Sequence, residues 1–151
     1  MRRRTVLAAV ASGTTTLGAT AGCVRLPPWS GDGTTTGAGV SASSLTVRDA
    51  GCGTGADEAS VSAEDATVSV SGTLPVADGC RTAALDDASV ADGTLRVVVA
   101  SVDRGGVEQC VQCLTDVAYD ASVTVADGRP ERVVVVHDSR GERRTVATVD
   151  L

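Results

Sequence analysis

Large apolar side chains are scarce in this sequence. Phe and Ile are absent, and Trp29 and Tyr119 are the only Trp and Tyr among 151 residues. A folded domain must therefore build its core from Val, Ala and Leu. These side chains bury less apolar surface than aromatic ones, and burial stabilises by roughly 25 cal/mol per Å². A single domain with such a core should gain from covalent cross-links.

Lys and Asn are absent too, so all thirteen basic residues are Arg, against nineteen acidic residues. Three arginines lie in the first four residues. From Cys23 onward, ten arginines therefore face nineteen acids, and the formal charge is −9. A surface of this charge repels phosphate backbones, so we expect no nucleic-acid binding. The absence of Asn excludes N-linked glycosylation.

The first 22 residues have the layout of a signal peptide: a basic start, a mildly apolar run and a zone of small residues. Arg3 and Arg4, one spacer residue and then Val6-Leu7 resemble a twin-arginine export signal. The apolar run is short and is interrupted by Gly and Thr. It therefore does not predict a membrane-spanning helix.

The leader ends in Ala19-Thr20-Ala21-Gly22-Cys23, which resembles a lipobox. In a lipobox the cysteine thiol receives a lipid and becomes the new N-terminus. Thr20 departs from the pattern, because an aliphatic residue is commoner there. The resemblance implies a lipid anchor at Cys23 on the extracytoplasmic face of the cell membrane. In the alternative, an ordinary signal peptidase cleaves after Ala21 and releases a soluble protein.

Residues 23–43 are rich in Gly, Ser, Thr and Pro and show no periodicity, which predicts a flexible tether. From Ser44 onward, period-two alternation predicts β-strands. The clearest cover 67–71, 94–102, 119–125 and 132–137, and weaker ones cover 44–48, 58–63, 83–90 and 144–149.

Turn signals separate these strands. They are Asp78-Gly79, Asp92-Gly93, Asp127-Gly128 and Ser139-Arg140-Gly141. The segment 107–117 is ambiguous and has room for one helical turn. We expect an all-β fold over residues 44–151, an antiparallel β-sandwich of immunoglobulin-like architecture with seven or eight short strands.

Once Cys23 is assigned to the lipid, an even number of cysteines remains: Cys52, Cys80, Cys110 and Cys113. In an exported protein such a set predicts disulfides. A Cys110–Cys113 bond would close a very small loop. We therefore favour the two long-range connectivities, which tie the early cysteines to 107–117, without choosing between them.

Two alternatives use the Cys110-Val111-Gln112-Cys113 motif. The first is a redox pair, although the helix N-terminus and βαβ unit usual for such pairs are lacking. The second is a four-thiolate zinc site, for which a single CxxC supplies half of the usual spacing.

His137 is the only histidine, and Asp138 follows it at the end of a predicted strand. We interpret the two as surface residues, because no hydrolase site assembles around them from the sequence. Asp86-Asp87 lacks the spacing of a calcium loop, and Arg104-Gly105-Gly106 lacks the Lys of a phosphate-binding loop. The sequence thus predicts no catalytic residue, no metal site and no cofactor.

Two stretches of the domain carry a wider resemblance. They are Gly72-Thr73-Leu74-Pro75 with 79–85 (GCRTAAL), and 110–121 (CVQCLTDVAYDA). Together with the Asp-rich, Lys-free composition, they resemble small exported lipoproteins of haloarchaea. The resemblance implies a habitat and an architecture rather than a reaction. Our hypothesis is a non-catalytic binding or structural module with an unidentified protein or small-molecule partner. The alternative is a thiol redox or metal-binding lipoprotein that uses Cys110 and Cys113.

Overall fold

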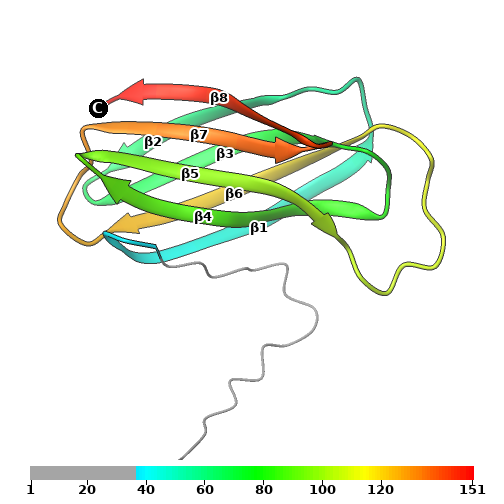
Figure 1. Ribbon diagram of the computed structural model, residues 1–151, viewed down its shortest axis with the longest axis horizontal. Coiled ribbons are helices and arrows are strands. Elements are labelled where there is room, and N and C mark those ends of the chain that lie inside the picture. The colour runs from blue at the N-terminus through cyan, green and yellow to red at the C-terminus, as the bar shows by residue number, and fades with distance from the viewer. Residues whose placement is uncertain (1–36) are drawn as a thin grey trace, which may run out of the picture.

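In the computed structural model, which describes residues 37–151, eight β-strands form two facing sheets (Figure 1). All eight predicted strands are present, and the all-β sandwich is confirmed. No helix among the described residues is long and apolar enough to cross a membrane. The strands are β1 (Val40–Cys52), β2 (Glu58–Glu64), β3 (Thr67–Val76), β4 (Arg81–Ala91), β5 (Thr94–Asp103), β6 (Thr115–Val125), β7 (Arg132–Ser139) and β8 (Glu142–Asp150).

The first sheet has the strand order β1-β6-β3-β2 and is antiparallel throughout. The second has the order β4-β5-β7-β8, and its central pair, β5 and β7, is parallel. This pairing departs from the antiparallel expectation. It arises because the chain leaves β5, crosses to the first sheet for β6, and returns to the second sheet running in its original direction. Both strands are valine-rich and largely buried, as central strands require.

The core between the sheets consists almost entirely of Val, Leu and Ala around Tyr119, whose side chain is fully buried. Alternating apolar residues in the strands supply this core, since every second residue of a strand points to the same face of its sheet. Fully buried members include Leu45, Val68, Val70, Leu74, Val76, Leu95, Val97, Val99, Val117, Val123, Val133 and Val135. The small-residue core expected from composition is therefore present.

Two of the predicted turns are tight hairpins. Asp92-Gly93 and Arg140-Gly141 each place two successive residues at positive φ (51° and 76°, 58° and 77°), as a type I′ turn requires. Asp78-Gly79 and Asp127-Gly128 instead join strands of different sheets. A further turn at Asp65 (φ 53°) has no Asp-Gly signal.

The first strand begins at Val40, so the folded region extends into the segment that the sequence assigned to the tether. Val40 is buried, and the preceding backbone is bound to the sandwich. The carbonyl of Ala38 accepts from Val90 N (2.7 Å), and that of Gly39 accepts from Ala126 N (2.9 Å). The predicted export residues, Arg3 and Arg4, and the predicted lipidation residue, Cys23, lie outside the described residues.

The sandwich has two chemically different ends (Figure 1). The chain enters β1 at one end, which also carries residues 65–66, 92–93 and 126–131; we name it the entry end. The opposite end carries residues 53–57, 77–80, 104–114 and 140–141. It holds all four cysteines of the domain, and we name it the disulfide end.

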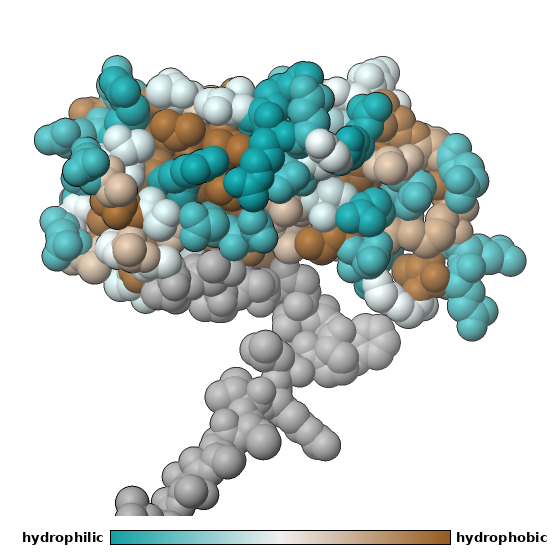
Figure 2. All heavy atoms as spheres, viewed as in Figure 1, coloured by the Kyte–Doolittle hydropathy of each residue, from teal (hydrophilic) through white to brown (hydrophobic). Residues whose placement is uncertain are grey.

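The visible face of the domain is mixed, with polar side chains separating small apolar patches (Figure 2). Four large apolar side chains are exposed among the described residues. Three of them, Val102, Val107 and Val111, lie at the end of β5 and in the 104–114 loop. Val111 is 63% exposed. Exposed apolar surface is therefore concentrated at the disulfide end.

Gly72 faces Tyr119 in the β3–β6 pairing and leaves room for its ring. A Cβ at this position would lie 2.6 Å from the Tyr119 hydroxyl and 2.8 Å from the Glu58 carbonyl oxygen. We expect Gly72→Ala to lower the free energy of unfolding by about 1–3 kcal/mol, the usual cost of overpacking. Gly51→Ala is the matched control, because a Cβ there meets nothing within 4 Å. Denaturant titration measures both, and equal midpoints for the two variants would contradict this account.

Candidate functional site

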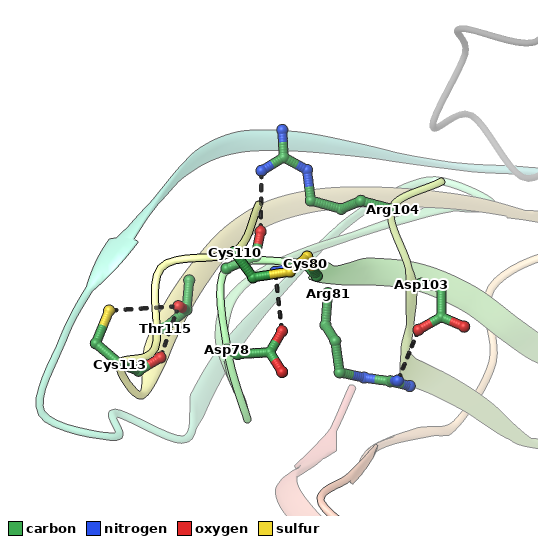
Figure 3. The surroundings of a disulfide bond; sticks show 9 residues. Asp78, Cys80, Arg81, Asp103, Arg104, Cys110, Cys113 and Thr115 are labelled. Atoms are coloured by element: carbon green, nitrogen blue, oxygen red, sulfur yellow. Dashed lines mark hydrogen bonds and ion pairs between the residues drawn. A yellow bond between two sulfur atoms is a disulfide. The ribbon is translucent and has the colours of Figure 1, made fainter. Parts of the chain in front are cut away.

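Two disulfides hold the loops of the disulfide end together: Cys52–Cys113 and Cys80–Cys110. Figure 3 shows the surroundings of the Cys80–Cys110 bond. They span 61 and 30 residues, so both are long-range bonds of the kind favoured from the sequence. Cys110 and Cys113 are not bonded to each other. Each ties the 104–114 loop to a different early segment, the end of β1 or the start of β4.

The 53–57 loop is positioned by β6 as well as by its disulfide. The Asp116 carboxylate accepts from the backbone N–H groups of Thr54 and Gly55, both at 3.2 Å. Gly53 N donates to the Leu114 carbonyl (3.0 Å). A Cβ at Gly53 would lie 2.0 Å from an Asp116 carboxylate oxygen, so only glycine fits at this close approach.

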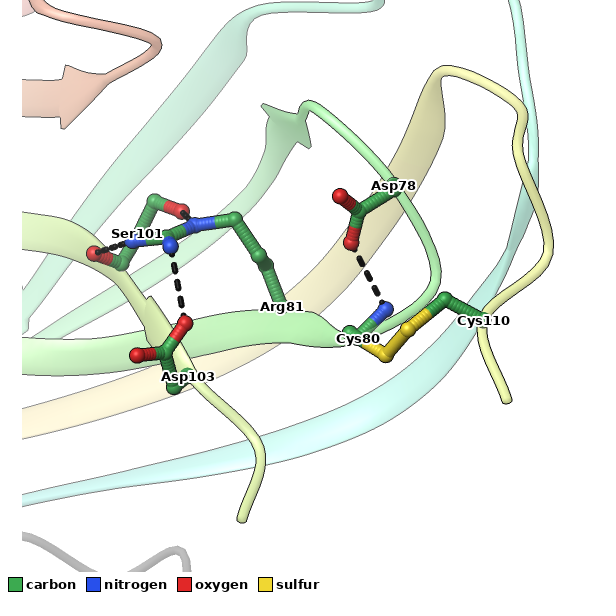
Figure 4. Close-up of polar contacts among 6 residues, drawn as sticks. All are labelled: Asp78, Cys80, Arg81, Ser101, Asp103 and Cys110. Carbon is green, nitrogen blue, oxygen red and sulfur yellow. Dashed lines mark hydrogen bonds and ion pairs between the residues drawn. A yellow bond between two sulfur atoms is a disulfide. The ribbon is translucent and has the colours of Figure 1, made fainter. Parts of the chain in front are cut away.

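The 77–80 loop is fixed by a local turn and by contacts with the 104–114 loop (Figure 4). Asp78 Oδ1 accepts from Cys80 N at 2.9 Å, which is an Asx turn. Gly79 N donates to the Val111 carbonyl (2.9 Å), and Arg104 N donates to the Cys80 carbonyl (2.8 Å). The Cys80–Cys110 bond therefore closes an interface that backbone hydrogen bonds already align.

Arg81 links the paired ends of β4 and β5 beside the Cys80–Cys110 bond (Figure 4). Its Nε donates to Ser101 Oγ at 2.7 Å, and its Nη2 donates to the Ser101 carbonyl at 3.0 Å. Its Nη1 pairs with Asp103 at 2.9 Å. All the polar atoms of the guanidinium group thus bind one strand end.

Asp78, Cys80 and Cys110 bring three potential metal-ligating atoms, one carboxylate oxygen and two sulfurs, within 4.8 Å of one another. The two sulfurs are bonded to each other, however, and metal ions bind thiolates. The four sulfurs lie in two separate pairs rather than around one point, which is the arrangement of structural bridges.

His137 is buried, with 2% of its surface exposed, so its interpretation as a surface residue was wrong. Its neighbour in sequence, Asp138, pairs with Arg143 instead (3.0 Å). The partners of His137 come from elsewhere in the chain. Its Nδ1 lies 2.5 Å from Asp57 Oδ1, and its Nε2 lies 2.7 Å from the Tyr119 hydroxyl.

The chemistry of the three side chains fixes the direction of these hydrogen bonds. A carboxylate only accepts, so Nδ1 carries the proton and donates to Asp57. Nε2 then accepts from the Tyr119 hydroxyl. Burial lowers the pKa of His137, and the hydrogen bond and negative charge of Asp57 oppose this effect. Burial raises the pKa of Tyr119, and the charge of Asp57 adds to the rise. Both groups are therefore neutral at pH 7.

This arrangement does not form a nucleophilic triad. The Tyr119 hydroxyl is fully buried and resists ionisation, so it is a hydrogen-bond donor and no nucleophile. The Asp57–His137–Tyr119 network instead joins the two sheets, because Tyr119 belongs to β6 and His137 to β7, with the 53–57 loop attached at its outer end.

Asp57 also borders a pocket of about 310 Å³. Arg144 spans two carboxylates there: its Nη1 lies 3.7 Å from Asp57 Oδ2, and its Nη2 lies 3.5 Å from Glu142. Both distances exceed those of charge-assisted hydrogen bonds, about 2.7–2.9 Å. The pocket is lined by Gly55, Asp57, Pro75, His137, Ser139, Arg140, Glu142 and Arg144.

Sequence reasoning singled out His137 but missed Asp57 and Tyr119 as its partners. The three residues are separated by 62 and 18 positions, and no motif links them. The sequence carried one usable signal, since the chain's only Tyr and only His both lie in apolar strands, where a buried polar atom needs a partner.

No family model, curated protein or solved structure matches this chain. The function of the site therefore has to be inferred from its own geometry.

Removing the Cys52–Cys113 bond with the double variant C52S/C113S should lower the free energy of unfolding by about 4 kcal/mol, from loop entropy. C80S/C110S should lower the free energy of unfolding slightly less, because the Cys80–Cys110 bond closes a shorter loop. Denaturant midpoints give both values. A reductant should reproduce the loss in the unmodified chain but have no further effect on the quadruple variant. Unchanged midpoints would contradict a stabilising role.

The lowered pKa of His137 gives stability a defined pH dependence. The folded state holds the neutral ring, so this contribution is complete above the ordinary pKa of about 6.5 and is lost as pH falls below it. We expect a loss of up to about 1.4 kcal/mol per pH unit in that range. Thermal unfolding across this range measures the slope. His137→Gln should flatten it, and an equal slope in the variant would assign the titration to another group.

Proposed function

We propose that this protein is a membrane-anchored extracytoplasmic lipoprotein whose β-sandwich acts as a non-catalytic binding or structural module. The observation that carries the proposal is the pair of disulfides, which bridge three loops at one end of the domain. Such bonds persist in oxidising compartments and are rare in the cytosol. They support the export that the twin-arginine resemblance of the leader implies.

The direction of the chain gives the anchor a geometric consequence. Residues 37–39 join the domain at the entry end, and β1 then runs to Cys52 at the disulfide end. A lipid at Cys23 would therefore leave the disulfide end as the part of the domain farthest from the attachment point. That end also carries the pocket and the exposed valines of the 104–114 loop.

The disulfide end has the construction of a binding surface. Loops from four separate parts of the chain meet there on a rigid sheet scaffold, an arrangement that commonly carries recognition. The bonds hold these loops in place before a partner arrives, which lowers the entropic cost of binding. The redox alternative gains no support, because Cys110 and Cys113 are each bonded to a distant cysteine.

Cell fractionation with Cys23→Ser tests the anchor. We expect the unmodified chain in the membrane fraction and the variant in the soluble exported fraction, because the variant lacks the thiol that receives the lipid. Ser30→Ala, in the same segment, is the control and should stay with the membrane. Mass spectrometry of the mature N-terminus should show lipid on Cys23. A mature chain that begins at Gly22, or a variant retained in the membrane, would contradict the proposal.

A further inference from the structure

The mostly buried carboxylate of Asp57 uses only one of its oxygens in a hydrogen bond. Its side chain is 18% exposed, and Oδ1 is occupied by His137. Asp57 lines the pocket, and the one ionic neighbour of its Oδ2 among residues 37–151, Arg144, lies 3.7 Å away. This distance is too long for a hydrogen bond. A half-buried carboxylate oxygen without a close donor favours a ligand that brings an N–H group.

Neither of the two guanidinium groups at this pocket makes a close hydrogen bond through its side chain. Arg140 lines the pocket from the tight β7–β8 turn and has no ion pair or hydrogen bond within the described part of the chain. Arg144 is held only by the two long contacts with Asp57 and Glu142. Guanidinium groups bind carboxylates through paired N–H donors. The pocket therefore offers an acceptor and donors of opposite charge.

The charges and size of the pocket narrow the ligand class. A dianion such as phosphate would face the carboxylates of Asp57 and Glu142, and a simple amine would face the two arginines. An apolar molecule would cover the four charged groups of the pocket without offering any of them a hydrogen bond. A volume of about 310 Å³ admits a molecule of amino-acid size.

We propose that this pocket binds a small zwitterion, a molecule carrying a protonated amine and a carboxylate. The amine donates to Asp57 Oδ2, and the carboxylate accepts from Arg140 and Arg144. The proposal deepens the function inferred above, since it assumes a binding module and names its ligand class. The Asp57–His137–Tyr119 network is the positioning element, because it holds the carboxylate at the pocket wall.

Ligand-observed NMR titrations of the full chain, purified in detergent, test the ligand class with three matched probes. Alanine carries both charges, ethylamine lacks the carboxylate, and propionate lacks the amine. We expect alanine to bind, and each singly charged probe to bind roughly tenfold more weakly or worse, since each loses a charge-assisted pairing.

Three variants locate the site. Asp57→Asn and Arg140→Gln should each weaken alanine binding by roughly tenfold. Arg129→Gln is the matched control: Arg129 is also an exposed loop arginine, but it lies at the entry end, and its loss should leave binding unchanged. If Asp57→Asn fails to fold, Arg140→Gln still decides, because Arg140 is exposed and makes no contact that the fold needs.

Propionate or ethylamine binding as tightly as alanine would overturn the zwitterion assignment. Undiminished alanine binding by Arg140→Gln would overturn the site. A complete absence of alanine binding, in a chain that still reaches the membrane through Cys23, would remove this ligand class and leave the anchored module standing. The two proposals therefore fail independently.

Discussion

The hydrogen-bond chain from Tyr119 through His137 to Asp57 is the interaction on which the disulfide end of this protein depends. It joins a buried Tyr of one sheet to a buried His of the other, in a core made almost entirely of Val, Leu and Ala. Its geometry is demanding, since each of the three groups satisfies another in low-dielectric surroundings. Removing one of the three side chains leaves the next without a hydrogen-bond partner, and an unpaired buried polar group costs about 1–3 kcal/mol. The network therefore specifies how the two sheets are aligned as well as stabilising them.

Asp57 reaches His137 only because its loop is held from the other side. Cys52–Cys113 ties the start of the 53–57 loop to the segment before β6, and Asp116 binds its backbone N–H groups. The disulfide thus positions the 53–57 loop, the loop positions the Asp57 carboxylate, and the carboxylate forms part of the pocket wall. Reduction of this one bond would act on the pocket without touching any residue that lines it.

Much of the fold was predictable, because alternation and turn chemistry are local properties. The strand at 67–71 follows from its alternating valines, and the strand at 132–137 follows from its run of four valines. The Asp92-Gly93 hairpin follows from the conformational freedom of its two residues. The even count of cysteines likewise predicted disulfides. What local pattern does not contain is which loops meet. The partners of Cys110 and Cys113, and the parallel pairing of β5 with β7, depend on how the chain crosses between sheets.

The burial of His137 shows the same limit at the site. A histidine beside an aspartate at a strand end is a common surface pattern, and only the packing of Tyr119 and the path of the 53–57 loop turn the ring inward.

The two ends of the sandwich differ in how much of their structure comes from local sequence. The entry end carries two tight turns between neighbouring strands, at 65–66 and 92–93, and neither disulfide lies there. The disulfide end is assembled from four segments that have no local reason to meet, so covalent bonds and a buried polar network fix them. A small-residue core supplies little stabilisation of its own, so the two cross-links carry much of the stability of this end.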